Sequence, residues 1–315
     1  MDLNPKTMRS GPAIRRAFGE DTDPGLIATG GSAMGASPKP PEYALGMPEA
    51  TNETHPVVFL HGWCGRADDV DSIRAALPGP VLPISWMPTG GDFDLERWPT
   101  EPDPDAGKEL AREFADGILD RVRTTIIDAE FVGATVIGHS LGGAMACVLA
   151  KDPDLAIRQI VLLDGNAPML PEKCRDDLDR MLPWVDRAAS GGRLLAQAGW
   201  IAEASSWVPD LFSLEDQGPV RLHIERRFLF APAVEAALTI AGGVQWPITE
   251  SLESTDCPVH GLGGEHGRMP VEALVACRPD AKVERMAGTG HYPHLFQAER
   301  TRKWLATGPF AATSA

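Results

Sequence analysis

Short apolar runs alternate with amphipathic segments through the first half of the chain. The runs have the length and composition of buried strands: HPVVFLHGW (55–63), PVLPISWM (80–87), GATVIGHS (133–140) and RQIVLLDG (158–165). The segments between them have helical spacing: 68–78, 103–126 and the small residues after Ser140. Strands separated by helices predict an α/β fold, with a mainly parallel sheet, right-handed crossovers and flanking helices.

This alternation is interrupted once. From about 166 to 255 the sequence is typical of helices and shows no clear strand; it then resumes with CPVHGLGG (257–264), a helix, AKVERMAG (281–288) and a last helix. Sheets of this kind bind ligands at the carboxyl ends of their strands, so we expect the insertion to cover those ends as a lid. Some of its tryptophans are expected to line the site: Trp184, Trp200, Trp207 and Trp246. The predicted organisation is a core of 42–165 and 256–315 with a helical lid of 166–255.

Residues 1–41 form a separate compositional segment, rich in Gly, Pro, Ser and Ala. They predict a flexible or surface-wrapping extension. The segment lacks the continuous apolar stretch of a signal peptide, and no run of 18 apolar residues occurs in the chain. We therefore expect no membrane span and a cytoplasmic location.

Composition narrows the function classes. Hydrophobic residues make up 43% of the 315, which is enough for a substantial core. A net charge of −15 disfavours nucleic-acid binding, because such proteins need a basic surface to displace counterions. The chain has five cysteines, an odd number, and no C-x-x-C motif. The spacing of His260 and His266 is not typical of a zinc site. We expect neither a disulfide framework nor a metal, and no cofactor; the oligomeric state stays open.

The residues Gly138-His139-Ser140-Leu141-Gly142 form the single G-x-S-x-G of the chain, where a predicted strand meets a predicted helix. In such a turn the serine has a strained backbone, and its hydroxyl stands clear of the sheet. The N–H of Leu141 then lies at a helix N-terminus, which favours negative charge. The alternative is a serine that only occupies the turn.

Together with His61-Gly62-Trp63 after an earlier strand and Gly290-His291 after the last one, this motif resembles the α/β-hydrolase family over about residues 42–305. The resemblance implies that Ser140 is a nucleophile. It also implies an oxyanion hole formed by the N–H groups of Leu141 and Trp63.

The same resemblance implies a histidine base near the C-terminus, and His291 fits this place. It would take the Ser140 proton and return it to the leaving group. His294 is a competing candidate three residues later, and His139 is expected to pack beneath the elbow.

The acid that orients His291 has two candidates. The family's more usual place, after the strand at 257–264, offers only Glu265. The other known place, one strand earlier, offers Asp164 in VLLDGNAP. An aspartate there can also merely cap a turn. We favour Asp164 because the usual position lacks an aspartate.

The resemblance favours a serine hydrolase that cleaves an ester, lactone or thioester through an acyl-enzyme, with a small hydrophobic substrate. One alternative comes from LHGWCGR, which is similar to a segment of cofactor-independent ring-cleaving dioxygenases for quinolones. Their elbow, however, is similar to Ser-His-Gly, where this chain has Ser140-Leu141-Gly142. A second alternative is a non-catalytic ligand-binding member of the fold.

Overall fold

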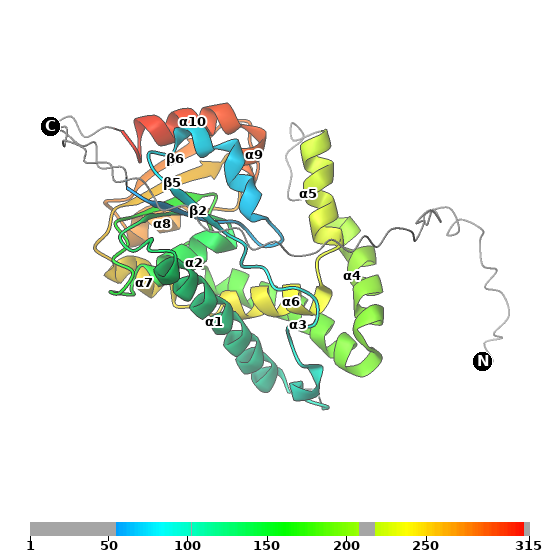
Figure 1. Ribbon diagram of the computed structural model, residues 1–315. Coiled ribbons are helices and arrows are strands. Elements are labelled where there is room, and N and C mark those ends of the chain that lie inside the picture. The colour runs from blue at the N-terminus through cyan, green and yellow to red at the C-terminus, as the bar shows by residue number, and fades with distance from the viewer. Residues whose placement is uncertain (1–54, 102, 208–217, 312–315) are drawn as a thin grey trace, which may run out of the picture. The chain divides into compact units, whose positions relative to one another are not determined.

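A six-stranded parallel sheet forms the centre of the computed structural model (Figure 1), which describes residues 55–101, 103–207 and 218–311, without the side chains of 206 and 207. The predicted extension, 1–41, lies outside the described residues. The strand order is β2-β1-β3-β4-β5-β6. The strands are β1 (Val57–Leu60), β2 (Val81–Ile84), β3 (Thr135–His139), β4 (Gln159–Leu163), β5 (Val259–Gly264) and β6 (Lys282–Met286). The predicted fold class, a mainly parallel sheet flanked by helices, is confirmed.

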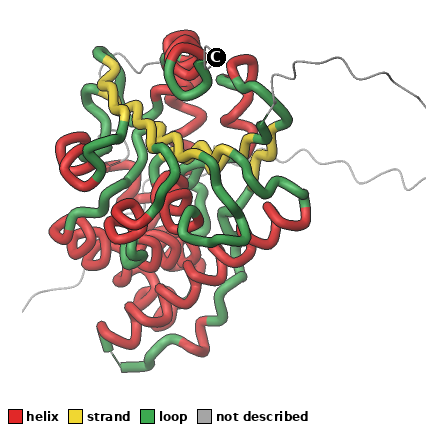
Figure 2. The backbone as a smooth tube through the Cα atoms, turned by 90° about the vertical axis from the view of Figure 1, so that its left-hand side faces the viewer, coloured by secondary structure: helices red, strands yellow, loops and turns green. Residues whose placement is uncertain are grey.

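Helices connect these strands and cover both faces of the sheet (Figure 2). The α-helices are α1 (Pro104–Asp128), α2 (Leu141–Leu149), α3 (Pro171–Gly191), α4 (Arg193–Trp207), α5 (Pro219–Leu229), α6 (Ala233–Gly243), α7 (Ile248–Ser254), α8 (Val271–Cys277), α9 (Pro293–Phe296) and α10 (Ala298–Thr307). The described residues also contain three 3₁₀ helices: η1 (Ala67–Ser72), η2 (Arg74–Ala76) and η3 (Leu95–Arg97). The single helix predicted over 68–78 is thus two 3₁₀ turns, since Ile73 N–H bonds back three residues to the Val70 carbonyl.

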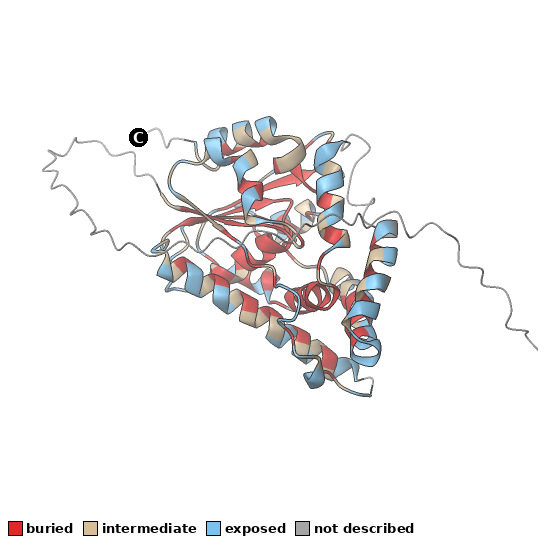
Figure 3. Ribbon diagram, turned by 45° about the vertical axis from the view of Figure 1, so that its right-hand side comes forward, coloured by how far each residue is buried: buried red, intermediate tan, exposed pale blue. Residues whose placement is uncertain are grey.

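Alternate residues of the strands enter two hydrophobic clusters, one on each face of the sheet. Val58 and Leu60 pack with α1 and α2, whereas Val57 and Phe59 pack with η1 and with Leu305 of α10. Figure 3 shows the central strands buried and the outer faces of the surrounding helices exposed, whereas the edge strand β6 is largely exposed. Coverage of both faces explains why β1, β3 and β4 are almost continuously apolar in the sequence.

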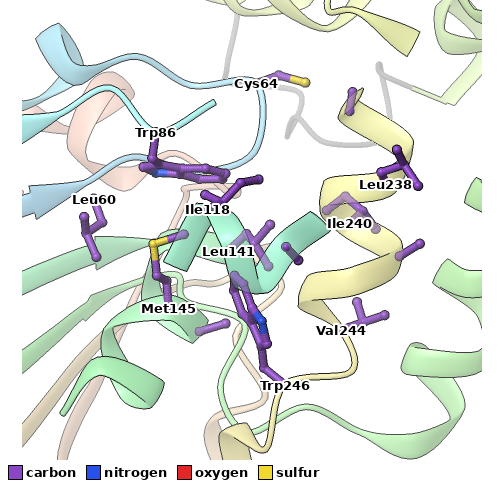
Figure 4. Close-up of a cluster of buried hydrophobic side chains, with 14 of the residues drawn as sticks. Leu60, Cys64, Trp86, Ile118, Leu141, Met145, Leu238, Ile240, Val244 and Trp246 are labelled. Carbon is purple, nitrogen blue, oxygen red and sulfur yellow. The ribbon is translucent and has the colours of Figure 1, made fainter. Parts of the chain in front are cut away.

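The described part of the insertion between β4 and β5 contains the helices α3 to α7, joined by loops, and no strand. Every residue of α6 is buried, and a Cβ at Gly242 would lie 2.0 Å from the carbonyl oxygen of Ala111 in α1. Ile240 of α6 joins Leu141 and Ile118 in one hydrophobic cluster (Figure 4). Helix α6 is therefore part of the packed body, whereas α3, α4 and α5 present exposed faces (Figure 3). The role of this insertion as a lid remains a prediction.

Topology gathers the candidate residues at one edge of the sheet. The chain passes from β1 outward to β2 and then returns to β3 on the other side of β1, which creates a switch point at the carboxyl ends of β1 and β3. Trp63 follows β1, Ser140 follows β3, Asp164 follows β4, and His291 comes after β6. Parallel strands place all four at the same edge.

Candidate active site

Ser140 lies between β3 and α2 in a backbone conformation that non-glycine residues rarely adopt, with φ 51° and ψ −121°. The turn is tight because three main-chain segments meet around it. A Cβ at Gly138 would lie 2.4 Å from the Gly142 carbonyl oxygen, and a Cβ at Gly62 would lie 3.0 Å from the Cβ of Ser140. The glycines of the motif are thus required by close backbone approach, and the turn holds Ser140 at the end of the sheet.

Gly142→Ala is expected to destabilise the protein by about 3 kcal/mol, because its Cβ would lie 2.3 Å from the Leu60 carbonyl oxygen and 2.4 Å from that of His61. Neither main-chain oxygen can move without disturbing β1. Gly117→Ala in α1 is the matched control, since a Cβ there would meet an Arg121 side chain only at 4.0 Å; it should leave stability unchanged or raise it by up to about 1 kcal/mol. Urea denaturation measures both, and equal midpoints for the two variants would contradict the steric argument.

Two buried hydrogen bonds connect Ser140, His291 and Asp164. The Ser140 hydroxyl donates to His291 Nε2 at 2.9 Å, and His291 Nδ1–H donates to Asp164 Oδ2 at 2.5 Å. All three side chains are buried. The structure therefore brings together the serine, the histidine and the earlier of the two candidate acids in the order that proton transfer from serine to histidine requires.

Asp164 is fully buried and is held by main-chain donors. Its Oδ1 accepts a hydrogen bond from Gly264 N–H at 3.0 Å, and its Oδ2 accepts one from Arg268 N–H at 2.6 Å. Burial alone would raise the pKa of Asp164, but the hydrogen bond and charge of His291 and these two amides lower it overall. Glu265 is exposed, and it accepts a hydrogen bond from Gly288 N–H instead. Asp164 thus stays ionised beside the imidazole.

The pKa of His291 is lowered, first by burial and then by the positive charges of Arg268 and Lys173, against the opposing effect of Asp164. A lowered pKa keeps the imidazole neutral at neutral pH. A neutral Nε2 is free to accept the serine proton, so the electrostatics of the site suit a general base.

Two further histidines lie beneath this site. His139 Nε2–H donates to the main-chain oxygen of His291 at 2.8 Å, which fixes the loop that carries His291. His294, the competing candidate, is buried in α9 against the rings of His139 and Phe59. Neither of its ring nitrogens has a hydrogen-bond partner among the described residues, so it contacts neither Ser140 nor Asp164 in this way.

Two buried histidines, His61 and His294, predict that the fold loses stability in acid. Burial lowers the pKa of His61 to about 4 and that of His294 to about 3, from 6.5. A lowered folded-state pKa gives stability that is complete above pH 6.5 and is lost as the pH falls toward 4. Because of these two groups together, the free energy of unfolding should fall by about 4 kcal/mol from pH 8 to pH 5.

Urea unfolding at several pH values measures this loss. His294→Phe should flatten the dependence, while replacement of the exposed His266 by alanine should leave it unchanged. An unfolding free energy of wild type that is constant from pH 8 to pH 5 would contradict the assignment.

The two predicted oxyanion donors lie beside the serine. Leu141 is the first residue of α2, so its N–H is one of the amides that an α-helix leaves without an internal partner. Trp63 lines the same small pocket as Ser140 and His291, and its indole N–H donates to the Ala236 carbonyl of α6 at 3.0 Å. The backbone at both positions is thus fixed by packing; their role as oxyanion donors remains a prediction.

The wall of this pocket differs from the hydrophobic one expected. Beside Ser140 and His291, its lining is formed by Trp63, Asn166, Lys173, Asp177, Arg180, Met181, Phe228, Ile240 and Arg268. The tryptophans expected there are elsewhere: Trp184 and Trp200 pack edge to face, and Trp246 donates to Asp116 in α1. The side chain of Trp207 lies outside the described residues. The lining contains none of Trp184, Trp200 and Trp246, because their large apolar area favours burial between helices. That some of the four tryptophans line the site therefore depends on Trp207 and stays a prediction.

Sequence reasoning missed several contributors to the site. Lys173, Asp177 and Arg180 have the i, i+4, i+7 spacing of one helix face, which was a detectable signal. Arg268 and Asn166 follow strands without any motif. Over the described ranges, no group of three or more His, Cys, Asp or Glu is placed to hold a metal, and no helix has the length and apolar character to cross a membrane.

Comparison with known proteins agrees with this architecture. The chain is 25% identical over 228 residues to 2-succinyl-6-hydroxy-2,4-cyclohexadiene-1-carboxylate synthase of Klebsiella pneumoniae, a match that covers 70% of this chain and 82% of that protein. A thermophilic esterase from Thermogutta terrifontis has a similar fold, with a TM-score of 0.59, 20% identity, and coverage of 80% of this chain and 88% of that one. The enol-lactonase from Burkholderia xenovorans LB400 also has a TM-score of 0.59, with 16% identity and coverage of 81% and 91%.

A family model settles the relationship. The model of the alpha/beta hydrolase family matches residues 57–304, which include every described strand and each of the residues gathered at the carboxyl edge of the sheet. The chain belongs to the alpha/beta hydrolase family.

Proposed function

We propose that this protein hydrolyses a carboxylic ester, lactone or thioester, with Ser140 as the nucleophile, His291 as the general base and Asp164 as the acid that orients it. The observation that carries the proposal is the pair of hydrogen bonds from Ser140 to His291 and from His291 to Asp164. A neutral imidazole between a hydroxyl and an ionised carboxylate is the arrangement that activates a serine.

In the first step, His291 Nε2 takes the hydroxyl proton as Ser140 Oγ attacks the substrate carbonyl. The negative charge that develops on the carbonyl oxygen is stabilised by the N–H groups of Leu141 and Trp63. His291 then gives its proton to the leaving oxygen or sulfur, and an acyl-Ser140 ester remains. Water, deprotonated by the same imidazole, attacks this ester; His291 then returns the proton to Ser140 Oγ as the bond from Oγ to the acyl carbon breaks and the acid is released. Asp164 stabilises the imidazolium in both halves of the cycle.

Labelling with a fluorophosphonate, followed by mass spectrometry of the peptide that contains Ser140, tests the proposal. We expect one phosphonyl group on Ser140, and hydrolysis of at least one class in a panel of esters, thioesters and lactones. Absence of both labelling and hydrolysis would favour the non-catalytic ligand-binding alternative. Oxygen consumption with a quinolone substrate, without ester hydrolysis, would favour the dioxygenase.

A second candidate is the reaction of the Klebsiella relative, which is a synthase. It is favoured by that sequence match, which spans most of both chains. Labelling of Ser140 without hydrolysis of any ester class would favour this candidate over the hydrolase.

A further inference from the structure

The pocket beside Ser140 carries an excess of positive charge that the rest of the chain does not. Its lining contains three basic side chains, Lys173, Arg180 and Arg268, and one carboxylate, Asp177. The whole chain has the opposite balance, with 44 acidic and 29 basic residues. The basic groups beside Ser140 therefore do not follow from the composition of this acidic chain, and they indicate that the pocket itself requires positive charge.

Helix α3 supplies two of these groups from one face. Lys173, Asp177 and Arg180 follow each other at intervals of four and three residues. Lys173 Nζ pairs with Asp177 Oδ2 at 2.7 Å, so the charge of this lysine is partly neutralised. The guanidinium of Arg180 has no ion-pair partner among the described residues, although it lines the pocket. Its positive charge is thus available to a ligand.

Arg268 supplies positive charge from a different element, the loop after β5. Its main-chain N–H donates to Asp164 Oδ2, so its backbone is fixed beside the proposed triad. Its side chain, too, lacks an ion-pair partner in the part of the chain that the structure describes. Arg268 and Lys173 are near enough to His291 that their charges act on its pKa. The cationic groups therefore lie within electrostatic range of the reacting atoms.

Asn166 adds an independent observation. Its main-chain N–H donates to the Ser140 carbonyl at 3.0 Å, and its side chain lines the pocket. The side-chain oxygen is buried without a hydrogen-bond partner among the described residues. An unsatisfied buried carbonyl oxygen costs about 1–3 kcal/mol, and since it accepts hydrogen bonds it fits a ligand that also carries a hydroxyl or an N–H better than an alkyl chain.

We propose that the substrate carries an oxyanion, a carboxylate or a phosphate, beyond the bond that is cleaved, and that the guanidinium groups of Arg180 and Arg268 bind it. This inference rests on the proposed function and names its substrate class. Two planar guanidinium groups favour an oxyanion because each can donate two parallel N–H bonds to it. The neutral, hydrophobic substrate expected from the sequence leaves the charges of the two arginines without partners.

Three esters of the same shape test the inference: 4-acetoxybenzoate, 4-acetoxyphenyl phosphate and the neutral methyl 4-acetoxybenzoate. We expect wild type to prefer at least one anionic ester over the neutral one by about 10-fold or more in kcat/KM. Because both arginines are exposed, the preference should shrink in 0.5 M NaCl. Preference for the carboxylate or for the phosphate identifies which oxyanion the site selects.

Variants assign the preference to particular residues. Arg180→Ala and Arg268→Ala should each lower kcat/KM for the preferred anionic ester by about 10-fold and change that for the neutral ester by less than about 3-fold. Arg175→Ala is the matched control, since Arg175 is an exposed arginine on the same helix that does not line the pocket. Equal kcat/KM for the three esters, or equal losses for anionic and neutral esters in both variants, would overturn the inference.

Binding to Ser140→Ala separates this inference from the proposed function, because binding needs no catalysis. Calorimetric titration should show tighter binding of an anionic ester than of the neutral one. Selective binding by this variant together with no turnover by wild type would mean that the hydrolase proposal fails while the anion site stands. Turnover by wild type without selective binding would mean the reverse.

Discussion

Replacement of Ser140 by alanine is expected to lower kcat for the best ester substrate by a factor of about 10⁴ or more and to abolish fluorophosphonate labelling. The serine oxygen forms the covalent bond in the proposed cycle, so its loss removes the acyl-enzyme route. The strained backbone at this position, with φ 51°, costs stability, as is typical of a residue whose side chain has a function.

The fold should survive this change. Alanine removes one hydroxyl whose recorded partner is His291, so the unfolding midpoint in urea should stay close to that of wild type. Leu141 and Trp63 remain in place, and the residual rate of the variant measures what they contribute without a nucleophile. Undiminished turnover or labelling of a folded Ser140→Ala protein would show that the elbow serine is only a turn residue.

The sequence alone was sufficient for most of the fold, because the information is local. A strand that is buried on both faces needs apolar residues along most of its length. The runs at 55–63 and 133–140 have this pattern and contain the buried strands β1 and β3. The turn at Ser140 was equally predictable, because only glycine tolerates the backbone contacts seen at Gly138 and Gly142.

Side chains that meet across the sequence could not be found in this way. The choice between Asp164 and Glu265 depended on which loop faces the imidazole, and neither local pattern specifies that. The positions of Trp184 and Trp200, outside the pocket lining, could not be predicted for the same reason. An aromatic side chain in a helical insertion packs wherever apolar surface is available, and here it is available between the helices.

The charge of the pocket was hidden for a related reason. No motif marks Arg180 or Arg268 in the sequence. The rest of the insertion and β5 lie between them along the chain. The two arginines become significant because the topology returns the chain from α3 to the carboxyl end of β5, next to β4. Composition gives only the net charge of the chain, which is negative, whereas the pocket lining is positive.

Asp164→Asn is expected to lower kcat by a factor of up to about 10⁴, close to the effect of His291→Ala. The carboxylate accepts His291 Nδ1–H and so leaves Nε2 unprotonated, facing the serine. An asparagine amide that donates to Nδ1 would favour the other tautomer, in which Nε2 carries the proton and cannot accept another. Removal of the negative charge would also lower the pKa of His291 further, since Asp164 opposes the effect of burial. The acidic limb of the pH–rate profile should therefore move to lower pH.

The hydrogen bonds around Asp164 imply that Asp164→Asn destabilises the protein, whichever way the new side-chain amide is oriented. Asp164 Oδ2 accepts both His291 Nδ1–H and Arg268 N–H, and its Oδ1 accepts Gly264 N–H, so an amide NH₂ at either place leaves a buried main-chain donor unpaired. We expect a loss of about 1–3 kcal/mol in unfolding free energy beside the loss of rate. Glu265→Gln is the control: its carboxylate is exposed and bonds only Gly288 N–H, so it should retain most activity and stability. If Glu265→Gln instead lost the greater part of kcat while Asp164→Asn kept it, the acid would be Glu265, and the hydrogen bond at 2.5 Å would serve the fold and not the reaction.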